Sequence, residues 1–270
     1  MKHKYKISLL LFIGIFAYLI FISLRVPDLT EKQALLTIFG NYNEASQTSI
    51  WKNMSIPPDE ENSYFSTGVG IVSVAFFQPY KEGGKKKFFL LTKTIPIDVP
   101  FECHACSPLL SGFVFSRDKN AWRVESQQRF LGYDGEYGIV PEARLIQIGS
   151  DKFGLLLAFK YVSSEMTGVE NEFLVPYKQN ITKAYSEMVY YNNFERCWRF
   201  IPCAAYTAKI DFDGSAKQEF FRLKVSKFGT DNDPKRSYKA VPVDEEAVYE
   251  FQNGKYVQVS RSGQGPVNDD

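Results

Sequence analysis

This sequence has very few histidines and none of the familiar catalytic motifs. His3 and His104 are the only histidines in 270 residues. His3 precedes a long apolar segment, so a Ser–His or Cys–His mechanism beyond that segment would have to use His104. No GxSxG, HExxH, P-loop or GxGxxG motif is present. We therefore expect neither a cofactor nor a metal, and no histidine-dependent catalytic group other than His104.

A surplus of charge of one sign is also missing. The chain has 32 basic and 31 acidic residues. Binding to nucleic acid needs a local excess of Lys and Arg, so we expect no nucleic-acid partner. The one basic run, Lys85-Lys86-Lys87, follows Gly83-Gly84 and is interpreted as the solvated tip of a hairpin.

One long apolar segment stands near the N-terminus. Ile7–Leu24 contains 18 consecutive residues without a charge, which as a helix would span about 27 Å, close to the thickness of a bilayer core. Lys2, Lys4 and Lys6 precede it, so the N-terminus should stay in the cytoplasm. We predict an uncleaved signal anchor in the lipid bilayer that places the remaining chain in the periplasm or outside the cell. A cleaved signal peptide is the alternative, although Phe21 fits its cleavage site poorly.

The four cysteines fall in two local pairs, Cys103 with Cys106 and Cys197 with Cys203. An exported domain meets an oxidising compartment, which favours disulfides. Three connectivities are open, and pairing within each local pair is the simplest. The alternatives are CxxC redox chemistry at Cys103 and Cys106, and zinc bound by four thiols or by three thiols with His104.

The segment after the anchor predicts a short helix. Thr30 and Gln33 have the spacing of a capping box, and Gly40 is a helix stop, so residues 31–39 should be helical. The expected organisation is then a cytoplasmic tail (1–6), the anchor (7–24), a juxtamembrane helix and linker (25–62), a β-rich exported domain (63–260) and a flexible tail (261–270).

Strand-like segments separated by short turns fill the exported part. Aromatic residues make up 16% of the chain, which suits pleated sheets. Turns such as Asp213-Gly214 and Asn253-Gly254 favour hairpins. Six hairpins are predicted, over residues 66–94, 110–126, 144–159, 173–188, 205–225 and 247–260. This pattern predicts an all-β fold, an antiparallel hairpin meander that closes as a sandwich, a barrel or a propeller-like array.

Two neighbouring segments carry a resemblance. CHACSPLLSGFVF, followed by Trp122 and then DGEYGIVPEARLIQIG at 134–149, resembles uncharacterised bacterial envelope proteins. In those proteins a CHAC-(Ser/Ala)-Pro motif leads into a strand, and a Gly-x-aromatic-Gly-x-x-Pro turn precedes a second hairpin. The match covers about 50 of the 270 residues, and Tyr137 stands where the pattern has Trp. The resemblance implies an exported bacterial protein and no activity.

Carboxylates near these two segments are the remaining catalytic candidates. Paired Asp and Glu side chains can hydrolyse glycosides without histidine. The nearest acidic side chains are Glu102, Asp134, Glu136 and Glu142, and we take His104, Asp134, Glu136 and Tyr137 as candidate site residues. DGEYG also fits a tight turn whose acidic groups face water.

These observations favour a non-enzymatic envelope module that binds a protein or glycan partner or has a structural role. The alternative is an envelope enzyme, either a carboxylate hydrolase or a CxxC thiol–disulfide protein. A third interpretation reverses the setting: in a eukaryotic secretory pathway, Asn53 and Asn180 would be glycosylation acceptors.

Overall fold

The fold is taken from a computed structural model of the chain. It describes most of the chain that follows the predicted anchor, over the residues 27–54, 68–97, 107–135, 138–162, 166–194, 197, 202–214, 218–233 and 239–266. The predicted anchor, Ile7–Leu24, lies outside these ranges. Within them, no helix is both long enough and apolar enough to cross a bilayer.

Strands dominate the described residues, which form thirteen strands and one helix, α2 (Glu31–Phe39). The first five strands are β1 (Ser49–Lys52), β2 (Val69–Glu82), β3 (Lys85–Pro96), β4 (Leu109–Asp118) and β5 (Ala121–Tyr133). The other eight are β6 (Glu142–Gly149), β7 (Lys152–Val162), β8 (Thr167–Tyr177), β9 (Asn180–Asn192), β10 (Ala205–Asp213), β11 (Arg222–Asp233), β12 (Lys239–Gln252) and β13 (Lys255–Gln264).

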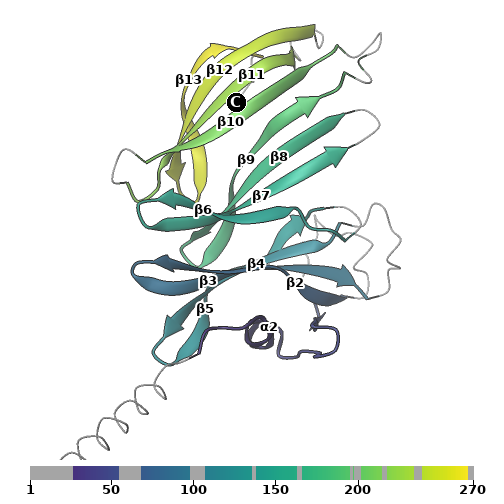
Figure 1. The fold of residues 1–270 in the computed structure, drawn as a ribbon, viewed down its shortest axis with the longest axis vertical. Coiled ribbons are helices and arrows are strands. Elements are labelled where there is room, and N and C mark those ends of the chain that lie inside the picture. Colours follow the sequence, from purple (N-terminus) through teal and green to yellow (C-terminus); the bar gives the residue numbers. More distant parts are fainter. Residues whose placement is uncertain are drawn as a thin grey trace, which may run out of the picture.

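Every strand pairs with its neighbours in sequence except at β5 and β6, where the chain passes from one sheet to the other, so the fold is an antiparallel meander in two sheets. One sheet has the order β1-β2-β3-β4-β5, and the other has eight strands in the order β13 to β6. The predicted all-β hairpin meander is confirmed, and all six predicted hairpins are present. The eight-stranded sheet bends strongly (Figure 1). The bend brings the β12–β13 turn onto the β8–β9 hairpin close to its tip, where Thr182 Oγ1 donates to Gly254 O at 2.8 Å.

The main core lies between the two sheets. Alternating residues of β3 point to opposite sides, so Phe89 and Leu91 face the eight-stranded sheet while Phe88 and Leu90 face α2. From β7, Leu155 and Leu157 meet the first pair. Burial on both faces explains why residues 88–91 in the middle of β3 are all apolar instead of alternating.

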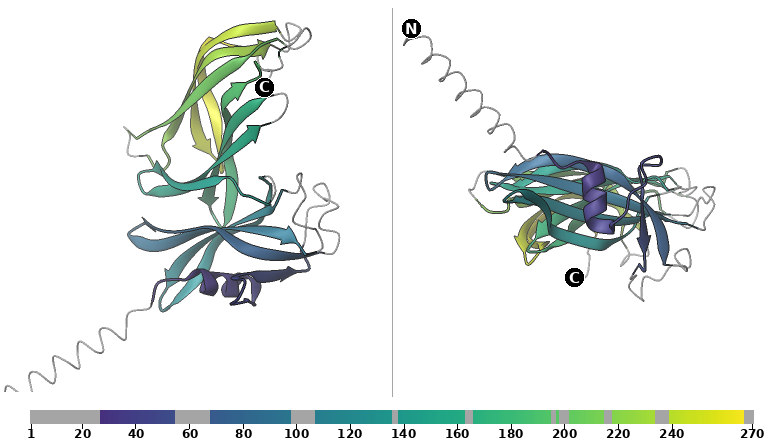
Figure 2. Two further views of the ribbon diagram at one scale, coloured as in Figure 1. Left: turned by 45° about the vertical axis from the view of Figure 1, so that its right-hand side comes forward. Right: turned by 90° about the horizontal axis from the view of Figure 1, so that it is seen from below.

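The helix covers the outer face of the five-stranded sheet (Figure 2). Its N-terminus has the predicted capping box, with reciprocal bonds between Thr30 and Gln33, and Gly40 ends it in the left-handed conformation (φ 72°). Ala34 and Leu35 are fully buried against the sheet. The helix is therefore part of the packed domain.

A separate core fills the concave side of the eight-stranded sheet. Leu156, Phe173, Leu223 and Tyr256 belong to it, and they come from strands far apart in the meander. The sheet therefore bends around its own aromatic side chains.

The structure differs from the sequence-based expectations at three places. Part of the expected linker forms the edge strand β1, because the buried Trp51 gives it an apolar anchor in the core next to α2. The expected flexible tail continues β13 as far as Gln264, which pairs with Asp244. Lys87 is buried at the expected solvated tip, because its ammonium binds two carboxylates, Glu82 at 3.1 Å and Glu125 at 2.6 Å.

Candidate functional site

The two segments that carry the resemblance lie side by side. Ser107 Oγ donates to the carbonyl oxygen of Gly135 at 2.6 Å, and the Asp134 amide donates to Pro108 O at 3.2 Å. Asp134 is the one predicted site residue, other than a cysteine, whose position the structure gives. The remaining predicted residues lie outside the described ranges: Cys103, His104, Cys106, Glu136 and Tyr137.

Asp134 takes part in an ion pair that joins the two sheets. Its Oδ2 lies 3.4 Å from Lys183 Nζ, which comes from β9 in the other sheet. The same ammonium lies 2.9 Å from Glu172 Oε2 of β8. Gly132 makes room for this approach, because a Cβ there would stand 3.2 Å from both Lys183 Nζ and Asp134 Oδ2. We name the group of Asp134, Glu170, Glu172, Lys183 and Tyr161 the acidic cluster.

Strand register explains why Glu170 and Glu172 point to the same side. Glu172 is paired with Leu157 on one neighbour and Ser186 on the other, and Glu170 is paired with Phe159. Cross-strand partners share a face of the sheet. Because Leu157 and Phe159 belong to the inter-sheet core, both carboxylates face the five-stranded sheet, at the edge of that core.

Burial shapes the electrostatics of the cluster. The Glu172 side chain is 9% exposed, and the Asp134 side chain is 20% exposed. Burial raises the pKa of both carboxyl groups, and the nearby Lys183 offsets the rise only in part. Glu172 Oε1 is fully buried and accepts no hydrogen bond from any residue in the described ranges. A buried acceptor usually has a hydrogen-bond partner, and an ordered water is one such partner.

Tyr161 and Ser186 bind the third carboxylate. Tyr161 Oη donates to Glu170 Oε2 at 2.8 Å, and Ser186 Oγ bonds the other oxygen of Glu170. Burial and the bond to Glu170 raise the pKa of Tyr161, so its hydroxyl stays protonated and remains a donor.

The cluster is short of positive charge. It has three carboxylates, and Lys183 is the one cation that forms an ion pair with them in the part of the chain that the structure describes. No group of three or more His, Cys, Asp or Glu side chains in that part has the arrangement of a metal site. The arrangement suits a ligand that supplies amine or hydroxyl donors.

Sequence analysis found Asp134 but missed Glu170, Glu172 and Lys183. One signal was available: Glu172 stands directly before the apolar run Phe173-Leu174-Val175, in a strand rich in apolar side chains. A charged residue at such a position is unusual unless it has a partner.

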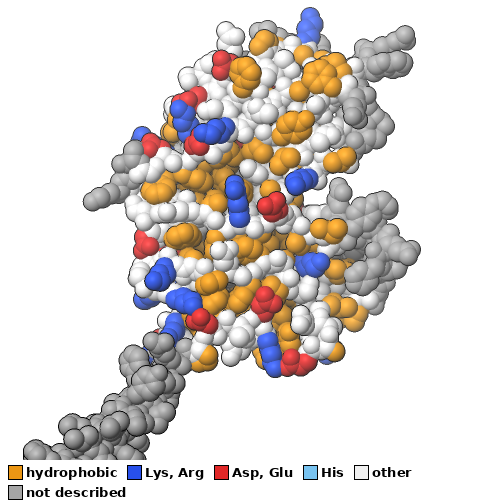
Figure 3. All heavy atoms as spheres, viewed as in Figure 1, with side chains coloured by type: hydrophobic (Ala, Val, Ile, Leu, Met, Phe, Trp, Pro, Cys, Tyr) orange, Lys and Arg blue, Asp and Glu red, His pale blue; other side chains and the backbone are white. Residues whose placement is uncertain are grey.

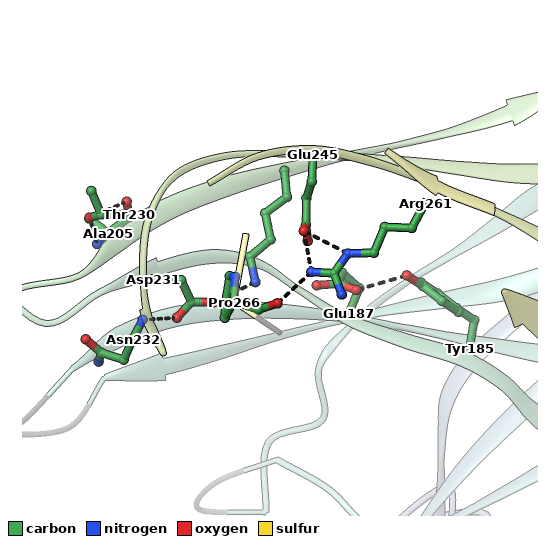
Figure 4. Close-up of polar contacts among 10 residues, drawn as sticks. Tyr185, Glu187, Ala205, Thr230, Asp231, Asn232, Glu245, Arg261 and Pro266 are labelled. Atoms are coloured by element: carbon green, nitrogen blue, oxygen red, sulfur yellow. Dashed lines mark hydrogen bonds and ion pairs between the residues drawn. The ribbon is translucent and has the colours of Figure 1, made fainter. Parts of the chain in front are cut away.

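A second polar cluster lies on the concave side of the eight-stranded sheet, near the end of β13 (Figure 4). Tyr185 Oη donates to Glu187 Oε2 at 2.9 Å. Arg261 Nε donates to Glu245 Oε2 at 3.0 Å, and its Nη2 donates to Pro266 O at 2.9 Å. Burial raises the pKa of Glu187, with a further contribution from the neighbouring Glu245. Most of these groups have partners within the cluster, so we interpret it as structural.

The disulfide Cys197–Cys203 is present, as the local pairing predicts. Asn193 supports the short loop: its Nδ2 donates to Pro202 O at 3.1 Å, and its Oδ1 accepts from Ala204 N at 2.8 Å. The bond uses two of the four thiols, so the four-thiol zinc site is not formed.

Comparison of the chain with protein-family models, with curated proteins and with solved structures found no match.

Proposed function

We propose that this chain is a membrane-anchored, exported binding module and that its acidic cluster binds an envelope glycan carrying free amino groups. The observation that carries this proposal is the charge imbalance of the cluster. Asp134 and Glu172 share the single ammonium of Lys183, and Glu170 has no cation partner among the described residues.

Charge complementarity supports an amine. Three carboxylates face one lysine, and burial raises the pKa of two of them, Asp134 and Glu172. A ligand ammonium would stabilise the ionised forms, and the Asp134 side chain, 20% exposed, is accessible to it. Lys183 adds donors for sugar hydroxyls, and the Tyr161 oxygen, whose proton is donated to Glu170, can accept from them.

The disulfide supports export, because such bonds persist in oxidising compartments. The predicted anchor, Ile7–Leu24, supports attachment to a membrane.

Calorimetry with two matched sugars tests the proposal. The full chain in detergent is titrated with chitosan oligosaccharide, which has free amines, and with chitin oligosaccharide, in which they are acetylated. We expect binding of the first that is at least tenfold tighter than binding of the second. Glu172→Gln should weaken chitosan binding at least tenfold, while Glu246→Gln, an exposed ion-pair residue on β12, should not. Equal binding of both sugars, or no effect of Glu172→Gln, would contradict the proposal.

A carboxylate hydrolase is the second candidate, favoured by one observation. Asp134 and Glu172 both have a raised pKa and both contact Lys183, and a general acid needs a raised pKa. Mass spectrometry of chitosan hexamer incubated with the protein distinguishes the two functions. Shorter products that disappear with Glu172→Gln would indicate hydrolysis, and intact hexamer would indicate binding alone.

A further inference from the structure

Three hairpin tips meet at one end of the molecule, on the left in Figure 1. Lys87 of β3 pairs with Ser116 of β4, so the β2–β3 and β4–β5 tips are neighbours. The Gly83 amide donates to Asp151 Oδ2, which adds the β6–β7 tip from the other sheet. We name this region the hairpin-tip end.

Exposed cations outnumber exposed carboxylates at the hairpin-tip end. Six cationic side chains are exposed or half-exposed: Lys81, Lys85, Lys86, Arg117, Lys119 and Arg123. Three exposed acidic residues, Asp28, Asp118 and Asp151, lie among them. Glu82 and Glu125 are bonded to the buried Lys87. Figure 3 shows several Lys and Arg side chains at the lower left, where these tips lie, with Asp or Glu side chains beside them.

The chain enters the domain at the same end. Trp122 Nε1 donates to Pro27 O at 3.1 Å, and Lys86 Nζ lies 2.6 Å from Asp28 Oδ2. Pro27 follows the predicted membrane segment, which ends at Leu24, by only three residues. Three extended residues reach about 10 Å, so an anchored chain must hold the hairpin-tip end close to the bilayer surface.

We propose that the hairpin-tip end is a membrane-contact surface that binds anionic phospholipid headgroups. The proposal rests on the anchor of the proposed function and goes beyond it, because it assigns a second contact and an orientation. Each cation near an anionic surface strengthens binding about fivefold. Trp122 beside the entry point is the kind of side chain that favours the interface between lipid and water.

The orientation places the acidic cluster away from the membrane. β5 begins at Ala121 in the hairpin-tip end and runs for 13 residues to Tyr133, directly before Asp134. Such a strand is about 40 Å long. The acidic cluster therefore faces the compartment where an envelope glycan lies.

Lysine acylation in nanodiscs tests this surface with the full chain. Discs of zwitterionic lipid are compared with discs containing anionic phosphatidylglycerol, and an amine-reactive acetyl ester is followed by mass spectrometry. We expect Lys85 and Lys119 to react at least fivefold more slowly in anionic discs. High salt should restore the rate, because it screens the charges. Lys209 and Lys255, exposed on the eight-stranded sheet, are internal controls and should react equally in both discs.

Co-elution of protein and discs reports on the anchor separately from labelling. A chain that does not co-elute would overturn both the anchor and this proposal. A chain that co-elutes without protection of Lys85 and Lys119, or with equal protection in both discs, would overturn the lipid contact alone.

The triple variant Lys85→Glu, Lys119→Glu, Arg123→Glu should abolish protection of Lys81, whereas the control variant Lys209→Glu, Lys224→Glu, Lys255→Glu should leave it unchanged. Glycan binding is measured independently and does not depend on these outcomes.

Discussion

Lys183 Nζ lies 2.9 Å from Glu172 Oε2, and this pair, in contact with Asp134, ties the eight-stranded sheet to the five-stranded one. Glu172 is almost completely buried, so its ionised form depends on the lysine. The contact therefore combines a structural role with the charge pattern of the proposed binding site.

Replacement of Lys183 by methionine should lower the free energy of unfolding by about 2 kcal/mol at pH 7. The value is smaller than for a fully buried pair because the Lys183 side chain is 40% exposed. Without the ammonium, the pKa of Glu172 rises further, so the loss should shrink as the pH falls and the carboxyl group takes up a proton. Urea denaturation at pH 7 and pH 5 measures this, with Lys224→Met, in an exposed ion pair, as the control. An equal loss of unfolding free energy at both pH values would contradict the role of Lys183 in stabilising the ionised Glu172.

Glu187 should make stability depend on pH in the opposite sense to an ordinary paired carboxylate. Burial raises its pKa in the folded state, so the folded chain binds the proton more tightly than the unfolded chain does. Stability from this group is then present at low pH and is lost as the pH rises from about 4.5, the unfolded value, through the raised folded value.

Glu187→Gln removes that loss, since the amide can still accept from Tyr185 Oη. We expect the variant to gain stability relative to the native chain between pH 4 and pH 7, by about 1.4 kcal/mol for each unit of the pKa rise. Urea midpoints at four pH values measure the slope. Glu246→Gln, on an exposed face, should leave the slope unchanged; a native slope in the Glu187→Gln variant would refute the claim.

Loss of the disulfide should destabilise the domain without unfolding it. Cys197 and Cys203 are six positions apart, and closing so short a loop stabilises by about 2 kcal/mol. Asn193 bonds Pro202 and Ala204 on the far side of the loop, so the strand ends stay together. The double variant Cys197→Ser, Cys203→Ser should retain its circular dichroism spectrum and lose about that much in urea. An unchanged free energy of unfolding would show that the disulfide does not stabilise the domain.

Gly149 should not tolerate a side chain. A Cβ at this position would overlap the backbone carbonyl of Glu219, in the segment that joins β10 and β11. Gly149→Ala should therefore cost about 1–3 kcal/mol. Gly214→Ala is the matched control, because its Cβ would meet only the Phe221 ring at ordinary contact distance. Similar urea midpoints for the two variants would count against the close packing.

Local features of this protein follow from the sequence. The helix at 31–39 is determined by Thr30, Gln33 and Gly40, which satisfy its terminal groups within a few residues. The six hairpins follow from alternating apolar side chains and short turns, and the Cys197–Cys203 bond follows from proximity in the chain. Each depends on interactions between residues close in sequence.

Tertiary structure alone decided which strand faces meet. Lys87 looks like one more lysine of an exposed tip, yet Glu125, 38 positions later, buries it in an ion pair. Asp134, Glu172 and Lys183 come together only because β5 of one sheet lies against β8 and β9 of the other. A single sequence shows the period of each strand but not its partner across the core, and the charges of both proposed surfaces depend on that partner.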